Sequence, residues 1–431
     1  MYHGDSSGIG IISHREVMNK IFFVIVLFLS TGCSFQQYNS NKLANQLHQQ
    51  SPEHILSIIQ SNKPNATDVA QYYLNMGYLQ LLSGEFNAAI DSLTTAKKEM
   101  RSLSAISISE NIAAGTVNET LRKYSGYPTD RVMVHNMLAL SYLFEQDIYG
   151  ARVEMLQADV AMKKLTGSEA FTGQLASTHL LSGIIYELLD ERSNAFISYQ
   201  LSEDILQERK IAVPSGLKLA LLRMSQKMDN EKAYQAYRKK YPESNLQVEA
   251  KEKQVFNLYF DGVVSSKKEN SIMVPNYSAE QLIRISMPIY PSIKYRTNSD
   301  KISDGIEQVN SQLIENIEAL VREDLNQEYP SILLLTTSRA IVKYKLVKKA
   351  QKQSGFLGAL VNIVALLSEV ADLRSWNMLP ATIQFSYLET NENNIRLYIN
   401  NTLDNTIDIN RGNQHVILKS NLSKNVFHYQ Q

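Results

Sequence analysis

The chain of 431 residues contains one cysteine, Cys33. A single cysteine excludes a disulfide within the chain and any cysteine-rich metal site. The chain also has no excess of positive or negative charge, because 43 basic residues balance 43 acidic ones. This neutrality gives no general argument for nucleic acid or another anionic polymer as a partner. The length favours two domains plus a leader.

Long apolar runs are missing as well, and the first short one marks the leader. Residues 21–29 are all apolar and follow Lys20, whereas a membrane-spanning helix needs roughly 20 such residues. A short apolar run after a positive residue is typical of a secretory signal. The small residues Ser30, Thr31 and Gly32 then lead directly to the cysteine.

Residues 29–33, with the sequence LSTGC, resemble the lipobox of bacterial lipoproteins. The leucine stands four residues before the cysteine here, whereas the commonest lipobox has it three before. The resemblance implies that residues 1–17 precede the true translation start, that residues 18–32 are a lipoprotein signal peptide, and that the Cys33 thiol is acylated, as by palmitate. The alternative is a buried free cysteine after a short core helix.

Acylation at Cys33 predicts a stable membrane anchor, because one acyl chain binds a bilayer only marginally and several bind it firmly. Ser34 follows the cysteine, where lipoproteins retained at the inner membrane often have aspartate. The resemblance therefore implies the periplasmic face of the outer membrane. Residues 33–67 are rich in Gln, Asn and Ser, and we interpret them as a polar tether that ends in a first helix.

Residues 68–246 repeat a helical pattern that resembles the tetratricopeptide repeat. Residues 72–96 carry small residues at Gly77 and Ala89, with a turn glycine at Gly84. Residues 135–158 and 179–202 repeat this pattern, and a degenerate fourth unit covers 217–242. The spacing predicts stacked pairs of helices, in which small residues allow the paired helices to approach closely. A generic helical bundle is the alternative.

Stacked helix pairs form a concave groove, lined mainly by the first helix of each pair. In the tetratricopeptide repeat certain positions of the first helix line this groove. The matching positions of this sequence are the partner-binding candidates Gln71, Leu74, Tyr78, Met133, Asn136, Leu140, Ser177, Ile184 and Glu187. This mostly apolar set would suit an amphipathic helix or an extended peptide. Equally, the groove could be filled by the C-terminal half of the same chain.

Residues 247–431 change to alternating apolar and polar residues, which predict strands. Residues 253–264 and 270–277 indicate a hairpin, and residues 281–295 another strand. A helix is expected over 306–326, then a break at Tyr329-Pro330 and a long helical pattern over 332–370; strands follow Pro380. The predicted fold class is therefore α+β: an N-terminal α-solenoid, then a β-sandwich-like domain with inserted helices.

Two segments, residues 131–143 and 339–386, resemble a family of poorly characterised bacterial lipoproteins. These proteins join tetratricopeptide-like repeats to a C-terminal domain, and no biochemical activity comes with the resemblance. The second segment contains Asp372, Arg374 and the only tryptophan, Trp376. A structural role at a helix-to-strand junction is one interpretation of these three; an exposed binding hot spot is the other.

Five lysines between 343 and 352 precede an apolar run at 356–367. A core helix after a solvated turn is one interpretation of this pattern, and a helix resting on a membrane surface is the other.

Motifs that would indicate catalysis are not apparent. The chain has no His-Glu-x-x-His, no phosphate-binding glycine loop and no nucleophile elbow. The single Ser-x-x-Lys match at 215–218 lacks its companion motifs. We therefore expect no enzyme, no cofactor, no metal site and no nucleic acid partner. The predicted function is a lipid-anchored periplasmic scaffold that binds another cell-envelope protein; the alternative is an envelope-polymer hydrolase with its site in the C-terminal domain.

Overall fold

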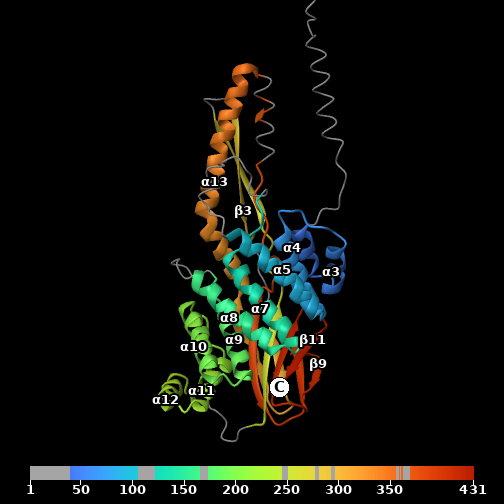
Figure 1. Ribbon diagram of the computed structural model, residues 1–431, viewed down its shortest axis with the longest axis vertical. Helices are drawn as coiled ribbons and strands as arrows, with labels where there is room; N and C mark the ends of the chain where they lie inside the picture. The colour runs from blue at the N-terminus through green and yellow to red at the C-terminus, as the bar shows by residue number, and fades with distance from the viewer. Residues whose placement is uncertain are drawn as a thin grey trace, which may run out of the picture. The chain divides into compact units, whose positions relative to one another are not determined.

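The computed structural model describes residues 39–104, 122–165, 173–244, 251–276, 281–292, 297–355, 359, 361–362 and 369–431. Residues Asn39–Gln431 form one compact unit (Figure 1). The predictions for the translation start, the signal peptide and Cys33 concern residues outside the described ranges.

Helices make up the described chain from Ser40 to Lys240. They are α2 (Ser40–Gln46), α3 (Pro52–Gln60), α4 (Val69–Ser83), α5 (Phe86–Ser104), α7 (Pro128–Phe144), α8 (Ile148–Leu165), α9 (Ala176–Leu188), α10 (Arg192–Glu208), α11 (Ser215–Lys227) and α12 (Glu231–Lys240). From α4 onward they pack as pairs: α4 with α5, α7 with α8, α9 with α10 and α11 with α12. Each predicted repeat unit therefore corresponds to one helix pair.

Glycines let the paired helices approach. A Cβ atom at Gly77 would lie 2.5 Å from Cγ of Leu93 in the second helix of its pair, and one at Gly183 would lie 2.4 Å from the ring of Tyr199. Only a residue without a side chain fits such contacts. Gly84 ends α4 in the left-handed conformation, with φ of 81°, which turns the chain into α5.

The start of the described chain is packed against the rest of the compact unit. The apolar residues of α2 and α3 that predicted an amphipathic stretch, Leu43, Ile55 and Ile59 among them, are buried. Ser40 donates a hydrogen bond of 2.6 Å to the side chain of Asn377. From Asn39 onward this polar segment is therefore part of the compact unit.

Strands and one long helix form the second half. They are β1 (Lys253–Asp261), β2 (Lys268–Asn276), β3 (Gln281–Ile289), β4 (Asp300–Ser303), β5 (Gln308–Asn310), β6 (Gln312–Asn316), α13 (Ile317–Gln353), β7 (Thr382–Thr390), β8 (Asn394–Ile399), β9 (Thr402–Asp408), β10 (Gln414–Ser420) and β11 (Val426–Gln430). The largest sheet has the order β11-β10-β1-β7-β6, the second β5-β4-β8-β9, and β2 and β3 form a separate hairpin.

The predicted hairpin between the first two strands is wrong. β1 pairs in parallel with β10 and antiparallel with β7, while β2 pairs with β3. The reason is burial. β1 is buried along nearly its whole length, which suits the middle of a sheet covered on both faces, whereas Ser271, Ile272 and Met273 of β2 are exposed.

The predicted helix over 306–326 and the break at Pro330 are also wrong. Residues 308–310 and 312–316 are strands, and α13 begins only at Ile317, where the Asn316 side chain accepts a hydrogen bond from the backbone of Ala319. The helix then continues through Pro330. Helices packed against other elements can retain an internal proline, because neighbours offset the one lost backbone bond.

The α+β architecture agrees with the prediction, since helical repeats precede the strands and α13 is inserted between β6 and β7. A cluster of buried side chains takes Val255, Leu388 and Ile417 from the largest sheet and Ile302 and Ile395 from the second. The finer description of this half as a β-sandwich stays a prediction.

Candidate functional site

The groove side of the helical repeats lies against the chain's own large sheet. The first helices of the pairs make the contacts: α7 touches β11, α9 touches β6 and α11 touches β7. In α4 the ring of Tyr78 stands 6.5 Å from that of Phe260 in β1. The nine groove residues predicted from the sequence, Gln71, Leu74, Tyr78, Met133, Asn136, Leu140, Ser177, Ile184 and Glu187, are all at most 6% exposed.

The polar members of this set bond to the same chain. Gln71 Nε2 donates to the backbone carbonyl of Ser375 at 2.6 Å. The backbone N–H of Ser177 donates to Glu315 Oε2 at 3.1 Å, and Arg209 pairs with the other oxygen of that carboxylate at 2.7 Å. The nine side chains therefore do not line an open groove in this structure. The C-terminal half fills the groove, as in the second of the two alternatives, and in this arrangement none of the nine is available to a partner.

A buried ion pair links Glu187 of α9 to Arg223 of α11, and it lies against Tyr387 of β7. Nε and Nη2 of Arg223 donate to the two carboxylate oxygens of Glu187 at 2.7 and 2.8 Å, and the guanidinium carbon lies 4.4 Å from the centre of the Tyr387 ring. The hydroxyl of Tyr199 donates to Glu187 at 2.8 Å. Burial alone would raise the pKa of Glu187, but attraction to Arg223 and these hydrogen bonds bring it below its ordinary value.

The three residues of the candidate hot spot have different surroundings. Trp376 is 0% exposed, so its ring belongs to the core. Arg374 pairs with Asp372 at 2.7 Å and with Asp68 at 3.3 Å, and it donates to the carbonyl of Thr67 at 2.9 Å. The structure favours the structural interpretation, since the arginine ties this junction to the start of α4.

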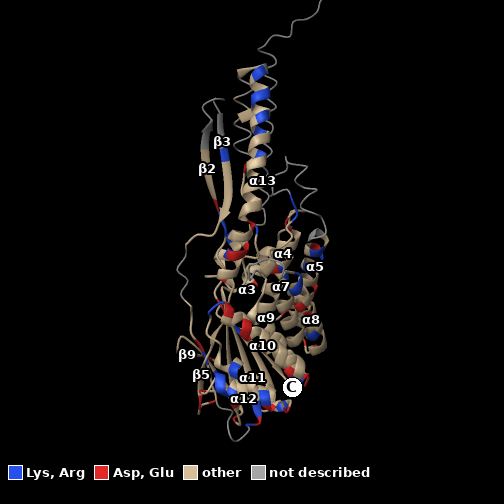
Figure 2. Cartoon of the chain, turned by 90° about the vertical axis from the view of Figure 1, so that its left-hand side faces the viewer, with Lys and Arg blue, Asp and Glu red and all other residues tan. Residues whose placement is uncertain are grey.

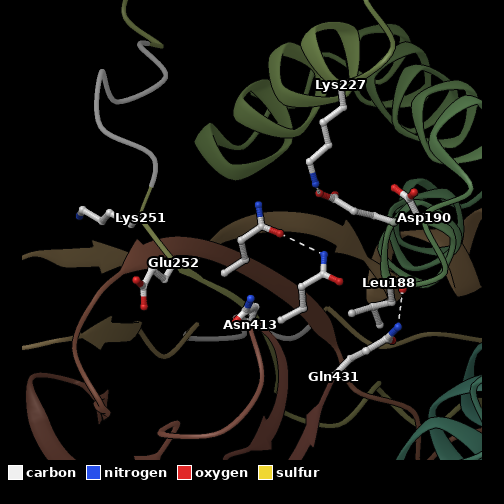
Figure 3. Close-up of a pocket in the computed structure, with 10 residues that line it drawn as sticks. Leu188, Asp190, Lys227, Lys251, Glu252, Asn413 and Gln431 are labelled. Atoms are coloured by element: carbon white, nitrogen blue, oxygen red, sulfur yellow. Dashed lines mark hydrogen bonds and ion pairs between the residues drawn. The ribbon is translucent and has the colours of Figure 1, made fainter.

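A polar pocket of about 420 Å³ opens beside the end of α9 (Figure 3). It is lined by Glu187, Leu188, Asp190, Lys227, Lys251, Glu252, Gln254, Asn413, Gln414 and Gln431. Its amides bond within the chain: Gln431 donates to the carbonyl of Leu188 at 2.7 Å and Gln414 to Gln254 at 3.0 Å. Because Arg223 occupies both oxygens of Glu187, this carboxylate is not free to act as a general base.

Among the described residues there is little evidence for a metal site or for a catalytic histidine. No group of three or more His, Cys, Asp or Glu residues among them could hold a metal ion. His135 Nδ1 lies 2.7 Å from Glu154, which also pairs with Lys97, and burial lowers the pKa of His179 to about 4. The alternative of an envelope-polymer hydrolase stays a prediction.

A cluster of buried ionisable groups joins the N-terminus of α7 to α13. Asp324 of α13 accepts a hydrogen bond of 3.0 Å from the backbone of Thr129 in the first turn of α7. Asp130 accepts one of 3.0 Å from the backbone of Tyr127, and Lys267 donates to the Tyr127 hydroxyl at 2.5 Å. Burial raises the pKa of Asp324 to about 7 and lowers that of Lys267 to about 8. Sequence reasoning missed this cluster, because its members come from distant parts of the chain: Thr129 and Asp324 lie 195 positions apart.

The raised pKa of Asp324 leads to a testable prediction of how the free energy of unfolding depends on pH. The carboxyl ionises near pH 4 in the unfolded chain but near pH 7 in the folded one. Its favourable contribution is therefore complete below about pH 4 and is lost as the pH rises to about 7. Asp324→Asn should match the wild type at pH 4 and exceed its free energy of unfolding by about 4 kcal/mol at pH 8, measured by urea unfolding.

A matched control separates this effect from a general change of charge. Asp91 is an exposed residue of α5, so Asp91→Asn should keep the pH dependence of the wild type. A difference between Asp324→Asn and wild type that stays constant from pH 4 to pH 8 would contradict the prediction.

Comparisons with other proteins add partial likenesses. No protein-family model matches the sequence, and a search of curated proteins finds no match. Among solved structures, the chain resembles three tetratricopeptide-like proteins: the apo form of RapI, MamA of AMB-1, and BtubC from P. vanneervenii. The TM-scores are 0.35, 0.31 and 0.30, and the identities 15%, 12% and 15%. The matches cover 46%, 48% and 46% of this chain, and 66%, 91% and 76% of the others. The chain thus spans slightly less than two thirds of the length of RapI.

Proposed function

We propose that this protein is a lipid-anchored scaffold at the periplasmic face of the outer membrane, without catalysis, which binds another cell-envelope protein. The lipobox-like sequence before Cys33 supports the anchor. The helical-repeat architecture supports the scaffold, because stacked helix pairs present extended surfaces to other proteins. Since the concave groove is filled by the chain's own sheet, the partner binds on the outer face of the repeats.

One observation carries this assignment: an apolar stripe on the exposed face of α8. Its members are Tyr149, Val153, Leu156 and Val160. They recur at intervals of four, three and four residues, which places them on one face of the helix. All four are between 42% and 70% exposed, while Ala151, Met155 and Ala158 on the opposite face are buried in the repeat.

The next repeat carries exposed apolar residues of its own. Arg152 of α8 pairs with Glu191 at the start of α10, with 2.5 Å between Nε and Oε1. On α10 the side chains of Ile197 and Leu201 are also exposed, one helical turn apart. Contiguous exposed apolar surface is uncommon on soluble proteins and usually marks an interaction site. A protein partner that buries an apolar helix face or loop fits this surface.

The experiment places a photo-crosslinking amino acid at Leu156 in whole cells. We expect a discrete crosslinked product that contains one envelope protein and that Val153→Asp reduces strongly, since a charge in the stripe opposes burial. The matched control is Thr94, an exposed position on α5, where no such product should form. Equal products at both positions, or none at Leu156, would reject this surface as the binding site.

The same cells test the anchor. After labelling with a palmitate analogue, the wild-type protein should carry the label and sediment with outer membranes, whereas Cys33→Ser should do neither. An unlabelled wild-type protein would remove the anchor from the proposal. Labelling tests the leader and crosslinking tests α8. One half of the proposal can therefore be rejected while the other stands.

A further inference from the structure

The outer part of α13 belongs to a stretch of sequence without acidic residues. Between Glu328 and Glu369 the chain contains no Asp or Glu. The same stretch contains six basic residues: Arg339, Lys343, Lys345, Lys348, Lys349 and Lys352. In a chain whose charges balance overall, this is a strong local concentration of positive charge.

These basic residues divide between two faces of the helix. Arg339 and Lys343 pair with Glu369 at 3.1 and 2.7 Å on the packed side, where Ile332 and Val347 are also buried. The other four lysines, at 345, 348, 349 and 352, are exposed. Within the described ranges no ion pair to these four is found, and the neighbouring residues 354–368 contain no acidic side chain.

Apolar residues share the exposed face with the four lysines. Leu334 and Ile341 are 56% and 52% exposed and lie seven residues apart, two helical turns. Lys345, Lys348 and Lys352 follow Ile341 at four, seven and eleven residues, so they continue the same face toward the end of the helix. This face therefore combines exposed aliphatic side chains with a row of ammonium groups.

The surroundings leave this surface accessible. The outer part of α13 extends away from the helical repeats, with the β2–β3 hairpin beside it (Figures 1 and 2). Basic residues recur along this part of the helix in Figure 2. On the hairpin, Ile272 and Met273 of β2 are exposed, and Glu269 is paired with Arg284 at 2.7 Å. None of the described helices is long and apolar enough to cross a membrane.

We propose that the exposed face of α13 binds the surface of an anionic phospholipid bilayer. Leu334 and Ile341 would enter the boundary between head groups and acyl chains, while the lysine stems lie along it and their ammonium groups meet the phosphates. Each lysine near an anionic surface contributes about 1 kcal/mol. The charge complementarity favours a lipid surface over a neutral partner. The exposed aliphatic residues favour it over nucleic acid, because they can enter the acyl-chain boundary of a bilayer but gain nothing from a phosphate backbone. This contact does not depend on acylation of Cys33.

The test uses residues 39–431, the compact unit of the structure, so that neither the leader nor an acyl chain contributes. Binding is measured by sedimentation with vesicles of phosphatidylcholine, with and without phosphatidylglycerol. The test variant carries Lys345→Gln, Lys348→Gln, Lys349→Gln and Lys352→Gln. The control removes the same charge from exposed lysines elsewhere, with Lys63→Gln, Lys98→Gln, Lys164→Gln and Lys232→Gln.

The wild-type unit should bind vesicles that contain phosphatidylglycerol and should bind them more weakly as salt is raised. The test variant should lose roughly a thousandfold in partition coefficient, and the control variant should stay within about threefold of wild type. Leu334→Asn with Ile341→Asn should also weaken binding, and the remaining binding should keep the salt dependence of the wild type, because the lysines are unchanged.

Three results would overturn the proposal: no binding to either vesicle, equal losses in the test and control variants, or a self-associated wild type that the test substitutions convert to monomers without a change in vesicle binding. The last result would assign the surface to a second copy of the chain. Circular dichroism and the urea midpoint of each variant show whether the unit is folded. The four test lysines are exposed, so we expect their substitution to leave both unchanged.

Discussion

Arg223→Met should lower the free energy of unfolding by about 3–5 kcal/mol, because it leaves the carboxylate of Glu187 buried without its main partner. Both side chains of the pair are almost wholly enclosed, at 6% and 1% exposure. The remaining partners are weaker: the Tyr199 hydroxyl at 2.8 Å and the ammonium of Lys227 at 3.4 Å. Methionine keeps most of the volume, so the loss reports on the charge and not on a cavity.

A double-mutant cycle isolates the interaction. Glu187→Gln alone leaves Arg223 buried without a counter-charge and should also be destabilising. The double variant, Glu187→Gln with Arg223→Met, removes both charges and should be more stable than the sum of the two losses predicts, by about 2 kcal/mol or more. Urea unfolding of the four proteins at one pH gives the coupling energy.

The pH dependence provides a second check on Arg223→Met. Without the guanidinium, burial would raise the pKa of Glu187, so the carboxyl could be protonated at mildly acidic pH. The stability lost at pH 8 should therefore be partly regained near pH 5. A loss below about 1 kcal/mol, or a loss that does not change with pH, would show that the pair is not an important link between the repeats and β7.

The helical repeats could be predicted from the sequence because their signals are local. Gly77, Gly84 and the apolar spacing around them lie within one helix pair, and the contacts that they predict are made within that pair. The order of strands is different, since β1 pairs with β10 about 160 positions later in the chain. No local pattern in β1 distinguishes this partner from the next strand, β2, which accounts for the wrong hairpin.

The groove was harder to assign than the repeats that form it. Apolar residues such as Leu74, Met133 and Ile184 suit the binding of a partner and the packing of the chain's own sheet equally well. Only long-range contacts distinguish partner binding from packing against the chain's own sheet. One such contact is the hydrogen bond from Gln71 to Ser375, which lies 304 positions later in the chain. The exposed stripe on α8 is different, because its spacing was visible in the sequence but its exposure depends on which face of α8 packs into the repeat.

Trp376→Ala should also lower the free energy of unfolding by about 3–5 kcal/mol. The ring is 0% exposed, and its Nε1–H has no hydrogen-bond partner among the described residues. Removing it would leave a large cavity beside the junction that Arg374 ties to α4. Trp376→Phe should cost much less, about 1–2 kcal/mol, since phenylalanine fills most of the space and the unpaired N–H is lost at the same time.

This prediction decides between the two interpretations of the only tryptophan. A binding hot spot would lose affinity for its partner when truncated and would keep its stability, whereas a core residue loses stability first. Tyr149→Ala provides the matched control, because Tyr149 is an aromatic residue with 70% exposure on the α8 stripe. It should change the free energy of unfolding by less than about 0.5 kcal/mol and reduce the crosslinking at Leu156. If instead Trp376→Ala leaves the urea midpoint unchanged, Trp376 is not part of the core and the hot-spot interpretation returns.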